Sequence, residues 1–382
     1  MVILMENRKC QVCTRCIMDT SDPSITFDEN GVCDFCNNYD KKIVPFWNPV
    51  KYDDPKIQDL VKKIKDSGKH KEYDCVIGMS GGTDSSYLAY IAKEKLGLRP
   101  LILTVDTGWN LNVANENVLK IIQKLDLDLE TVVVNWEEMK DLQLAFFKSQ
   151  VPYQDLPQDH AIFAGLYNYA AKHGIKYVLT GANNSTEGVK PPQEWTYIND
   201  IKFIKGVHKK FGQNKLRTFP LCGMFKYKIF YRFFKGIKVV HFLNMVDYEK
   251  DDATRLLKQE FDWQVYENKH YENVFTRFYE GYWLPKKFGY DKRRCYLSNL
   301  VITNQMSRKD ALVEIEAQPY DNRIAKQDME YISDKLDIDV EEFKTLMTGE
   351  NKTYKDYKNN YWIIKLAIRF AMLIGVEKRN FR

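Results

Sequence analysis

A short loop, GMSGGTDSS at residues 78–86, places two glycines, several hydroxyls and one carboxylate directly after the apolar run Cys75-Val76-Ile77. Glycine has no Cβ, so backbone N–H groups can approach an anion closely, and a following helix adds its positive end. A carboxylate beside phosphates requires a bridging cation, typically Mg²⁺. We therefore expect a phosphate-binding loop rather than a simple tight turn, formed by Ser80, Gly81, Gly82, Thr83, Asp84 and Ser85.

Four cysteines near the N-terminus have the spacing of a closed, structural zinc site, with two C-x₂-C pairs sixteen residues apart: Cys13, Cys16, Cys33 and Cys36. Between the pairs, Asn30-Gly31 predicts a two-residue hairpin turn, so the segment is expected to form a zinc ribbon. A disulfide framework and unrelated thiols are the alternatives, and a long cytoplasmic chain argues against disulfides. Cys10 has C-x₂-C spacing to Cys13, which leaves the identity of one ligand open.

Strand and helix patterns alternate beyond the ribbon and must position the loop. Apolar strands are predicted at 73–79, 99–108, 130–136 and 176–183, and helices at 57–68, 85–97, 115–127, 137–149 and 159–173. Such alternation favours an α/β fold with a parallel sheet, in which ligands bind beyond the carboxyl ends of the strands. The loops GMSGGTDSS, DTGWN and TGANNSTEG should therefore converge at one edge of the sheet.

Composition indicates a soluble cytoplasmic protein with several domains. The 382 residues carry a net charge of +5, and no apolar run approaches the roughly 18–20 residues that span a bilayer. We expect a ribbon at 1–48, a linker and helix at 49–72, a nucleotide domain at 73–220 and a largely helical substrate-binding region at 221–382. The apolar segment YWIIKLAIRFAMLIGV at 361–376 is expected to pack as core or at a subunit interface, and a membrane-surface role for it has no support in the sequence.

The loop lacks the lysine of a Walker motif and is no dinucleotide fingerprint. It matches the SGGxDS signature and so resembles the PP-loop ATPases, whose core is adenine nucleotide alpha-hydrolase-like (HUP). This resemblance implies cleavage of ATP between the α and β phosphates. It also implies that Val105 and Asp106 meet the adenosine and that Gly181 and Asn183 lie in a second nucleotide-facing loop. Asp106 could equally be a turn carboxylate or helix cap.

A wider set of motifs resembles the N-acetyl sugar amidotransferase family: CTRCIMDTSDPSITFDENGVCDFC, MSGGTDSS, VDTGWN, TGANNSTEG and KHYENVFTRFYEGYWLPKKFGYDKRR. The resemblance implies conversion of an acetamido sugar into an acetamidino sugar, for bacterial surface polysaccharide (O-antigen or capsule) or flagellar glycan. It implies ATP and Mg²⁺, and ammonia from a class I glutamine amidotransferase (glutaminase) partner. No glutaminase triad is legible in this chain, which agrees with a separate partner.

Polar residues beyond the loop are further candidates. On a helix, Lys269, Asn273 and Arg277 would share one face, as would Glu272 and Thr276. Lys292, Arg293 and Arg294 form a basic triplet that could reach phosphates or a sugar carboxylate. Catalytic roles are assigned to Asp84, Glu187, Lys292 and Arg293, and contacts to a nucleotide-activated sugar to Asn184, Lys269, Glu272, Arg277 and Arg294. Glu187 is assigned to orient substrate or take a proton from ammonia, with a solvated loop residue as the alternative. Many of the lysines could form a solvated face and many of the aromatic residues could be core.

Two other functions fit parts of the sequence. A tRNA-modifying, thiolation-type PP-loop enzyme could carry a ribbon and a basic, aromatic surface. Such enzymes use a cysteine pair near the nucleotide, whereas Cys75, Cys222 and Cys295 are scattered here. A non-catalytic nucleotide-binding scaffold is disfavoured by the intact loop. We therefore expect no nucleic acid and no membrane among the partners.

Overall fold

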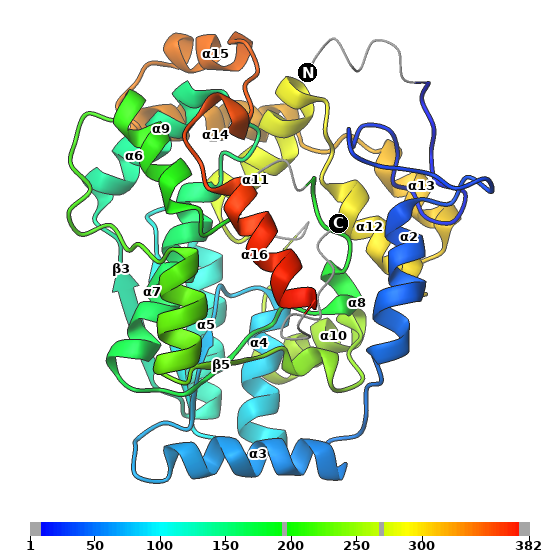
Figure 1. Cartoon of the computed structure of the whole chain (residues 1–382), viewed down its shortest axis with the longest axis vertical. Helices are drawn as coiled ribbons and strands as arrows, with labels where there is room; N and C mark the ends of the chain where they lie inside the picture. The colour runs from blue at the N-terminus through cyan, green and yellow to red at the C-terminus, as the bar shows by residue number, and fades with distance from the viewer. Residues whose placement is uncertain (1–8, 193–196, 267–270, 374–382) are drawn as a thin grey trace.

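A five-stranded, wholly parallel sheet forms the centre of the computed structural model, which describes residues 9–192, 197–266 and 271–373. The strand order is β3-β2-β1-β4-β5, so β1 lies between β2 and β4. Figure 1 labels the two edge strands, β3 and β5. The strands are β1 (Cys75–Gly78), β2 (Pro100–Asp106), β3 (Leu129–Val133), β4 (Tyr177–Leu179) and β5 (Lys238–Val240). The expected α/β fold with a parallel sheet is confirmed, and β5 is an additional strand that the sequence did not predict.

Alternating side chains of the strands feed two separate cores, because successive residues of a strand point to opposite faces. Val76 and Val178 pack on one face with α6 and α7, whereas Ile77 and Leu179 pack on the other with α3, α4, α5 and α10. Both faces are thereby covered, as parallel sheets require. The helices of this part are α3 (Pro55–Gly68), α4 (Thr83–Tyr90), α5 (Asn112–Leu125), α6 (Trp136–Ser149), α7 (Leu156–Lys172), α8 (Asn184–Glu187), α9 (Ile201–Phe211) and α10 (Lys250–Phe261).

Helices dominate the C-terminal region, as expected from its sequence. Its α-helices are α11 (Val274–Phe278), α12 (Arg293–Ile302), α13 (Arg308–Glu316), α14 (Asn322–Lys335), α15 (Val340–Thr348) and α16 (Tyr361–Leu373). Wider π-helical turns are η1 (Tyr39–Ile43), η3 (Ile91–Lys95), η5 (Lys226–Phe234) and η7 (Tyr279–Phe288), and short 3₁₀ turns are η2 (Val44–Phe46), η6 (Phe242–Asn244) and η8 (Tyr354–Asp356). Among the described residues, the structure has no helix long and apolar enough to cross a membrane.

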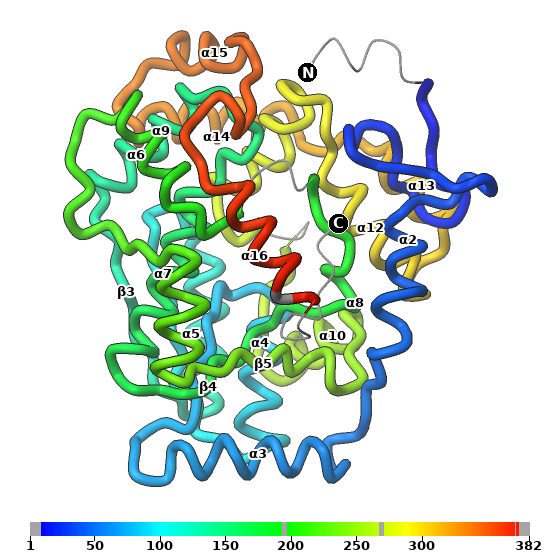
Figure 2. Tube along the Cα trace, in the orientation of Figure 1, coloured from blue at the N-terminus to red at the C-terminus, as the bar shows by residue number. Residues whose placement is uncertain are grey.

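The N-terminal cysteine-containing segment packs on α12 and α13 rather than on the sheet (Figure 2). The Arg308 guanidinium donates to the carbonyls of Cys13 and Cys16 at 2.8 and 3.0 Å, and Arg294 donates to the carbonyl of Ile17 at 2.9 Å. Helix α2 (Asp34–Asn38) follows the second cysteine pair. These contacts attach the segment to the far end of the chain.

The turn between the two cysteine pairs differs from the expected one. Only Gly31 has a positive φ, of +74°, whereas the prediction required it at Asn30 as well. The Gly31 N–H donates to the Asp28 carbonyl and the Asp28 N–H donates to the Val32 carbonyl, both at 3.0 Å. The connection is therefore a three-residue turn closed by a left-handed glycine, which is another common hairpin type.

Candidate active site at the carboxyl ends of the strands

A cavity of about 430 Å³ opens where β1 and β4 end, and residues from both halves of the chain line it. The phosphate-binding loop contributes Ser80, Gly82, Thr83, Asp84 and Ser85, and the loop after β4 contributes Gly181 and Glu187. The C-terminal region contributes Glu272, Asn273, Thr276, Glu280 and Lys292. The predicted convergence of loops therefore holds for the first and the last of the three loops, and Asn110 represents the middle one.

Gly81 can be no other residue in this backbone. Its φ is +85°, and a Cβ would lie 2.5 Å from the Ala114 carbonyl oxygen of α5. Gly82 is the N-cap of α4, which directs the free N–H groups of the first helical turn toward the cavity. The loop thus has the backbone form of an anion site.

The Asp84 carboxylate is held from two sides inside the cavity. The Tyr248 hydroxyl donates to Oδ1, and the Thr186 hydroxyl donates to Oδ2 at 3.4 Å. Burial raises the pKa of Tyr248 well above its ordinary value, so its proton stays on the phenol oxygen. Gly181 packs on this backbone, because a Cβ there would lie 3.0 Å from the Asp84 carbonyl carbon. The Asp84 carboxylate is therefore held in a fixed orientation in the cavity.

A second carboxylate reaches the loop from the C-terminal region. The Ser80 hydroxyl donates to Glu272 Oε1 at 3.2 Å, and a Cβ on Gly82 would lie 3.1 Å from the same oxygen. Asn273 is the N-cap of α11, accepting from the Thr276 N–H at 3.0 Å. Because α11 begins only at Val274, Glu272 and Asn273 precede the helix on which we expected them, and Lys269 lies outside the described residues.

An acidic group that the sequence analysis missed lines another part of the cavity. The Asp155 carboxylate accepts from Gln158 Nε2 at 2.7 Å and from the Thr276 hydroxyl at 2.8 Å. Burial raises the pKa of Asp155 to about 8, and the neighbouring Asp159 carboxylate adds to the shift. A carboxyl group that titrates near neutral pH is suited to proton transfer.

Lys292 is the positively charged side chain that lines the cavity beside these carboxylates. Its ammonium donates to Glu280 Oε1, and the Tyr296 hydroxyl donates to Glu280 Oε2 at 3.0 Å. Burial would lower the pKa of Lys292, but the Glu280 carboxylate holds it above its ordinary value. Lys292 therefore lies in the cavity as predicted, already paired and charged.

Three predicted arginines do not reach the cavity. Arg277 makes a bidentate pair with Asp328, with both contacts at 2.7 Å. Arg293 pairs with Asp291 at 2.7 Å and donates to the carbonyl of Ala317 at 2.9 Å. Arg294 is turned toward the N-terminal segment and pairs with Asp19 at 3.1 Å. Their placement corrects the roles assigned from sequence, because each guanidinium is engaged in holding elements together.

Four other predicted residues lie near the cavity without lining it. Asn183 caps α8, accepting from the Thr186 N–H at 2.8 Å, and the Asn184 N–H donates to Asn244 Oδ1 at 2.6 Å. Asp106, at the end of β2, accepts from the Gly108 N–H at 2.8 Å, and Val105 is almost fully buried beside it. These contacts agree with the alternative reading of Asp106 as a turn carboxylate.

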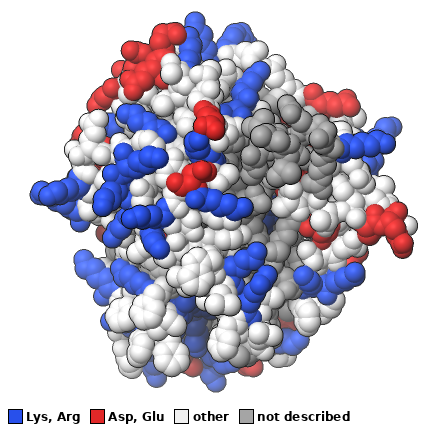
Figure 3. All heavy atoms as spheres, turned by 45° about the horizontal axis from the view of Figure 1, so that its top comes forward, with Lys and Arg blue, Asp and Glu red and all other residues white. Residues whose placement is uncertain are grey.

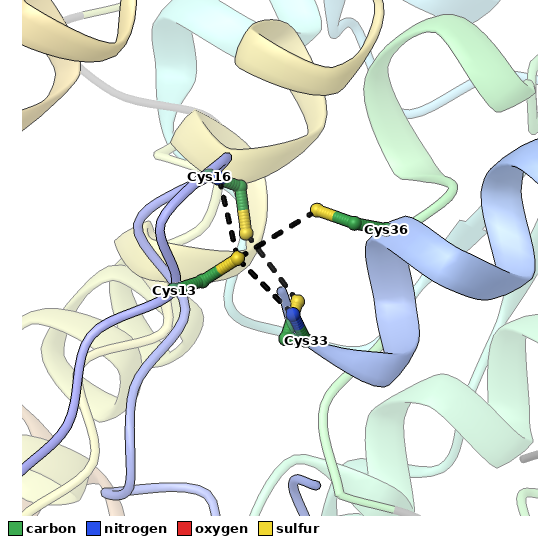
Figure 4. Close-up of side chains that lie close together, drawn as sticks. All are labelled: Cys13, Cys16, Cys33 and Cys36. Atoms are coloured by element: carbon green, nitrogen blue, oxygen red, sulfur yellow. Dashed lines mark hydrogen bonds between the residues drawn. The ribbon is translucent and has the colours of Figure 1, made fainter. Parts of the chain in front are cut away.

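The four predicted cysteines form a compact, buried group (Figure 4). Their sulfurs all lie within 4.8 Å of one another, with Cys16 and Cys33 at 3.6 Å and Cys13 and Cys36 at 3.9 Å. Four thiolates about 2.3 Å from a tetrahedral ion would lie about 3.8 Å apart. Cys10 is exposed and stands outside this group, which resolves the open choice of ligands. The residues present therefore fit one metal ion.

Two family models match the chain, one on each side of the cavity. The NAD synthase model matches residues 56–189, which include the phosphate-binding loop and four strands of the sheet. The model described as LPS biosynthesis protein WbpG-like, C-terminal domain, matches residues 272–369, which include Glu272, Glu280 and Lys292.

Individual relatives are distant. An uncharacterized protein of Methanocaldococcus jannaschii is 24% identical over 45% of this chain and 58% of its own length. The tRNA-specific 2-thiouridylase MnmA 2 of Fusobacterium nucleatum is 30% identical over 29% of this chain and 34% of its own length. The solved NMN synthetase of Francisella tularensis is 21% identical, over 55% of this chain and 86% of that one, with a TM-score of 0.28. The chain thus spans less than two thirds of the two curated relatives.

Proposed function

We propose that the chain is an ATP-using, N-acetyl sugar amidotransferase-like PP-loop enzyme, which replaces the acetamido oxygen of an N-acetyl sugar with ammonia. The product is an acetamidino sugar for a bacterial surface polysaccharide, in keeping with the lipopolysaccharide function of the matched C-terminal domain. The main observation in support of this proposal is that the phosphate-binding loop and the residues Asp155, Glu280 and Lys292 line one cavity.

The reaction has two balanced steps. The acetamido oxygen attacks the α-phosphorus of ATP, pyrophosphate leaves, and an O-adenylyl imidate forms. Ammonia then attacks the imidate carbon, gives up a proton, and AMP leaves with the former amide oxygen. The first step turns a poor leaving group into a good one, and both steps need the reactants held together away from water.

Residues of the cavity divide between these steps. The N–H groups of the loop and the hydroxyls of Ser80, Thr83 and Ser85 would hold the departing pyrophosphate. Asp84 and Glu272 are the carboxylates that would hold Mg²⁺, which neutralises charge on the phosphates when bound. Asp155, with its pKa of about 8, is suited to accept the proton that ammonia releases. Glu187 remains a proposed substrate contact.

Lys292 and the amide side chains nearby suit the sugar. Lys292 is a fixed donor in the cavity, and Asn273 and Gln158 present a buried polar wall joined by a hydrogen bond of 2.9 Å. A nucleotide-activated sugar would bring the phosphates and hydroxyls that such groups recognise. We assign ammonia supply to a separate class I glutaminase, and the four-cysteine group to a structural Zn²⁺.

The tRNA-modifying alternative receives support from the thiouridylase relative. Against it, no cysteine lines the cavity among the residues described, and Cys75, Cys222 and Cys295 are all fully buried elsewhere. Burial also raises the pKa of the Cys222 thiol to about 11, which disfavours the nucleophilic thiolate. A sulfur relay therefore has no carrier in the described cavity wall.

The test is mass spectrometry of candidate nucleotide-linked N-acetyl sugars incubated with the full chain, ATP, Mg²⁺ and ammonium. A product one mass unit lighter, formed with equal amounts of AMP and pyrophosphate, is expected because NH replaces O. The Asp84→Asn variant serves as the inactive control. AMP formation that tRNA stimulates and no sugar stimulates would reject the proposal in favour of the tRNA-modifying enzyme.

A further inference from the structure

Two helices of the described structure, η5 and α16, expose an unusual amount of apolar surface. Of the nineteen large apolar side chains that are exposed in the described structure, ten belong to η5 with the residue before it and to α16. We name this set the aromatic face: Phe225, Ile229, Phe230, Phe233 and Phe234 from the first segment, and Trp362, Ile363, Leu366, Phe370 and Leu373 from the second. The exposed fractions of Phe225, Phe233 and Phe234 are 76, 78 and 70%.

The inner side of the η5 segment is fixed to the protein, and its outer side chains point to solvent. Tyr227 and Tyr231 are buried on its inner side, where the Tyr227 ring lies 4.8 Å from that of Phe163. The Tyr231 hydroxyl donates to Asn168 Oδ1 of α7 at 2.6 Å. In a π-helix, with more than four residues per turn, the phenylalanines fall on the opposite side from these tyrosines.

The two helices begin at the same place on the protein. The Asn199 amide contacts Met224 Sδ at 3.5 Å just before η5. The Asp200 carboxylate accepts from the Asn360 N–H at 2.7 Å, just before α16. Figure 1 shows α16 across the front of the molecule. The residues just before η5 and just before α16 are therefore both held by the neighbouring residues Asn199 and Asp200.

The stretch of sequence that contains η5 carries charge of one sign. Residues 201–246 contain no Asp or Glu, whereas the rest of the chain has more acidic than basic residues. The eleven Lys and Arg residues of this stretch are Lys202, Lys205, Lys209, Lys210, Lys215, Arg217, Lys226, Lys228, Arg232, Lys235 and Lys238. Helix α16 also has no acidic residue. In the lower part of Figure 3, blue and white spheres predominate and the red spheres lie toward the edges.

We propose that the aromatic face docks the protein peripherally on an anionic phospholipid surface. Exposed Phe, Trp and Leu side chains flanked by Lys and Arg are the composition of helices that lie in the membrane interface. The apolar rings would enter the acyl boundary while Arg232 and Lys235 meet the phosphates. Complementary charge selects this partner over a protein surface, because the whole 46-residue stretch lacks any acid that a mixed-charge protein interface would use. This docking revises the expectation that the chain has no membrane partner.

The experiment is co-sedimentation of the full chain with vesicles, without ATP or sugar, so that it is independent of the proposed catalysis. Vesicles of phosphatidylcholine alone are compared with phosphatidylcholine and phosphatidylglycerol at about three to one. Preferential binding to the anionic vesicles that weakens with added salt is expected. Each basic residue near an anionic surface contributes about 1 kcal/mol, or about fivefold in partitioning, so Arg232→Gln with Lys235→Gln should lower binding on the order of 10- to 30-fold.

Matched variants distinguish vesicle binding by the aromatic face from nonspecific binding by any exposed apolar or basic side chain. Phe233→Ser with Phe234→Ser should abolish sedimentation, whereas Phe46→Ser with Val313→Ser, which removes equally exposed apolar side chains elsewhere, should leave it unchanged. Lys62→Gln with Lys63→Gln is the control for charge. Unaltered thermal unfolding shows that each variant is folded.

Equal binding by the aromatic-face variants and their controls, or no binding of the wild type to anionic vesicles, overturns the proposal. Loss of glutaminase binding in Phe233→Ser with Phe234→Ser, without any vesicle binding by the wild type, assigns the face to the protein partner and likewise overturns it.

Discussion

The Ser80 hydroxyl of the phosphate-binding loop donates a hydrogen bond of 3.2 Å to Glu272, which lies 192 residues away in the chain. This bond crosses from the NAD synthase-like part to the WbpG-like part. A carboxylate therefore stands beside the loop where phosphates would arrive, and it must exchange its serine contact for a cation. The two matched regions meet at the point where ATP would be cleaved.

Glu272→Gln is expected to raise the Mg²⁺ concentration needed for half-maximal AMP formation, because one negatively charged ligand is lost while the hydrogen bond to Ser80 can persist. Titration of Mg²⁺ at saturating ATP measures the effect. The matched control is Glu260→Gln, which changes an exposed carboxylate of α10. An unchanged Mg²⁺ requirement in Glu272→Gln would remove Glu272 from the cation site.

Asp84→Asn is expected to lower AMP and pyrophosphate formation on the order of 10²- to 10³-fold, the usual loss for a removed charge-stabilising group. Tyr248→Phe, which removes only the hydroxyl that orients Asp84, should lower the rate far less. Rates are read from pyrophosphate release at saturating ATP. A Tyr248→Phe defect as large as that of Asp84→Asn would make orientation, and not the charge, the main contribution of this pair.

Asp155 should impose a pH dependence on the ammonia step. Since its pKa is raised to about 8 and its ionised form accepts the proton, kcat/KM for the nucleophile should rise as the pH increases through about 8. Hydroxylamine as nucleophile avoids the titration of ammonium itself. The Asp155→Asn variant should be slow and lack this rise; persistence of the rise would remove Asp155 as the group responsible.

The same shift has a consequence for stability. A carboxyl group whose pKa is higher in the folded than in the unfolded state binds more protons when folded, so stability falls as the pH rises from about 4 to about 8. Asp155→Asn should flatten this part of the profile. Thermal unfolding of wild type and variant at several pH values measures it, and parallel profiles would contradict the assignment.

Cys33→Ser should lower the metal content and the unfolding temperature, because the Zn²⁺ proposed for the four-cysteine group would contribute several kcal/mol or more to folding. Metal content and thermal unfolding are measured together. Cys10→Ser is the control, since Cys10 is exposed and outside the group, and it should change neither. Full metal content in Cys33→Ser would show that the four-sulfur site is not the one occupied.

Arg277→Ala should lower stability by about 3–5 kcal/mol, because it leaves the buried Asp328 carboxylate without its partner. Arg277→Leu with Asp328→Leu should recover much of that loss. Denaturant unfolding gives the free energies, and KM for the sugar should be unchanged in the double variant. A large rise in KM there would restore the substrate contact expected from the sequence.

Four strands and the phosphate-binding loop could be predicted because each is a local pattern. Buried β-branched runs followed by glycine define β1, β2 and β4, and C-x₂-C spacing defines the cysteine group. By contrast, β5 has three residues, Lys238–Val240, inside a basic and aromatic run, too short for any periodicity to register.

At the cavity, the sequence could not show which way the side chains point. Asp155, Gln158 and Asp159 lie at the start of α7, where acidic residues ordinarily favour a helix N-terminus, and nothing local distinguishes a cavity from solvent. Their density in the stretch PYQDLPQDH was the one available signal. The three arginines between 277 and 294 have the residue type expected of a substrate site, but each forms an ion pair with an aspartate: Asp328, Asp291 or Asp19. Only the folded chain reveals these contacts.

Helix α12 joins three parts of the protein. Lys292 at its start enters the cavity, Arg294 holds the cysteine segment, and Asn299 donates to the Ser185 carbonyl beneath the second loop at 2.7 Å. Loosening of the cysteine segment would therefore remove one of three supports of the helix that carries Lys292 into the cavity.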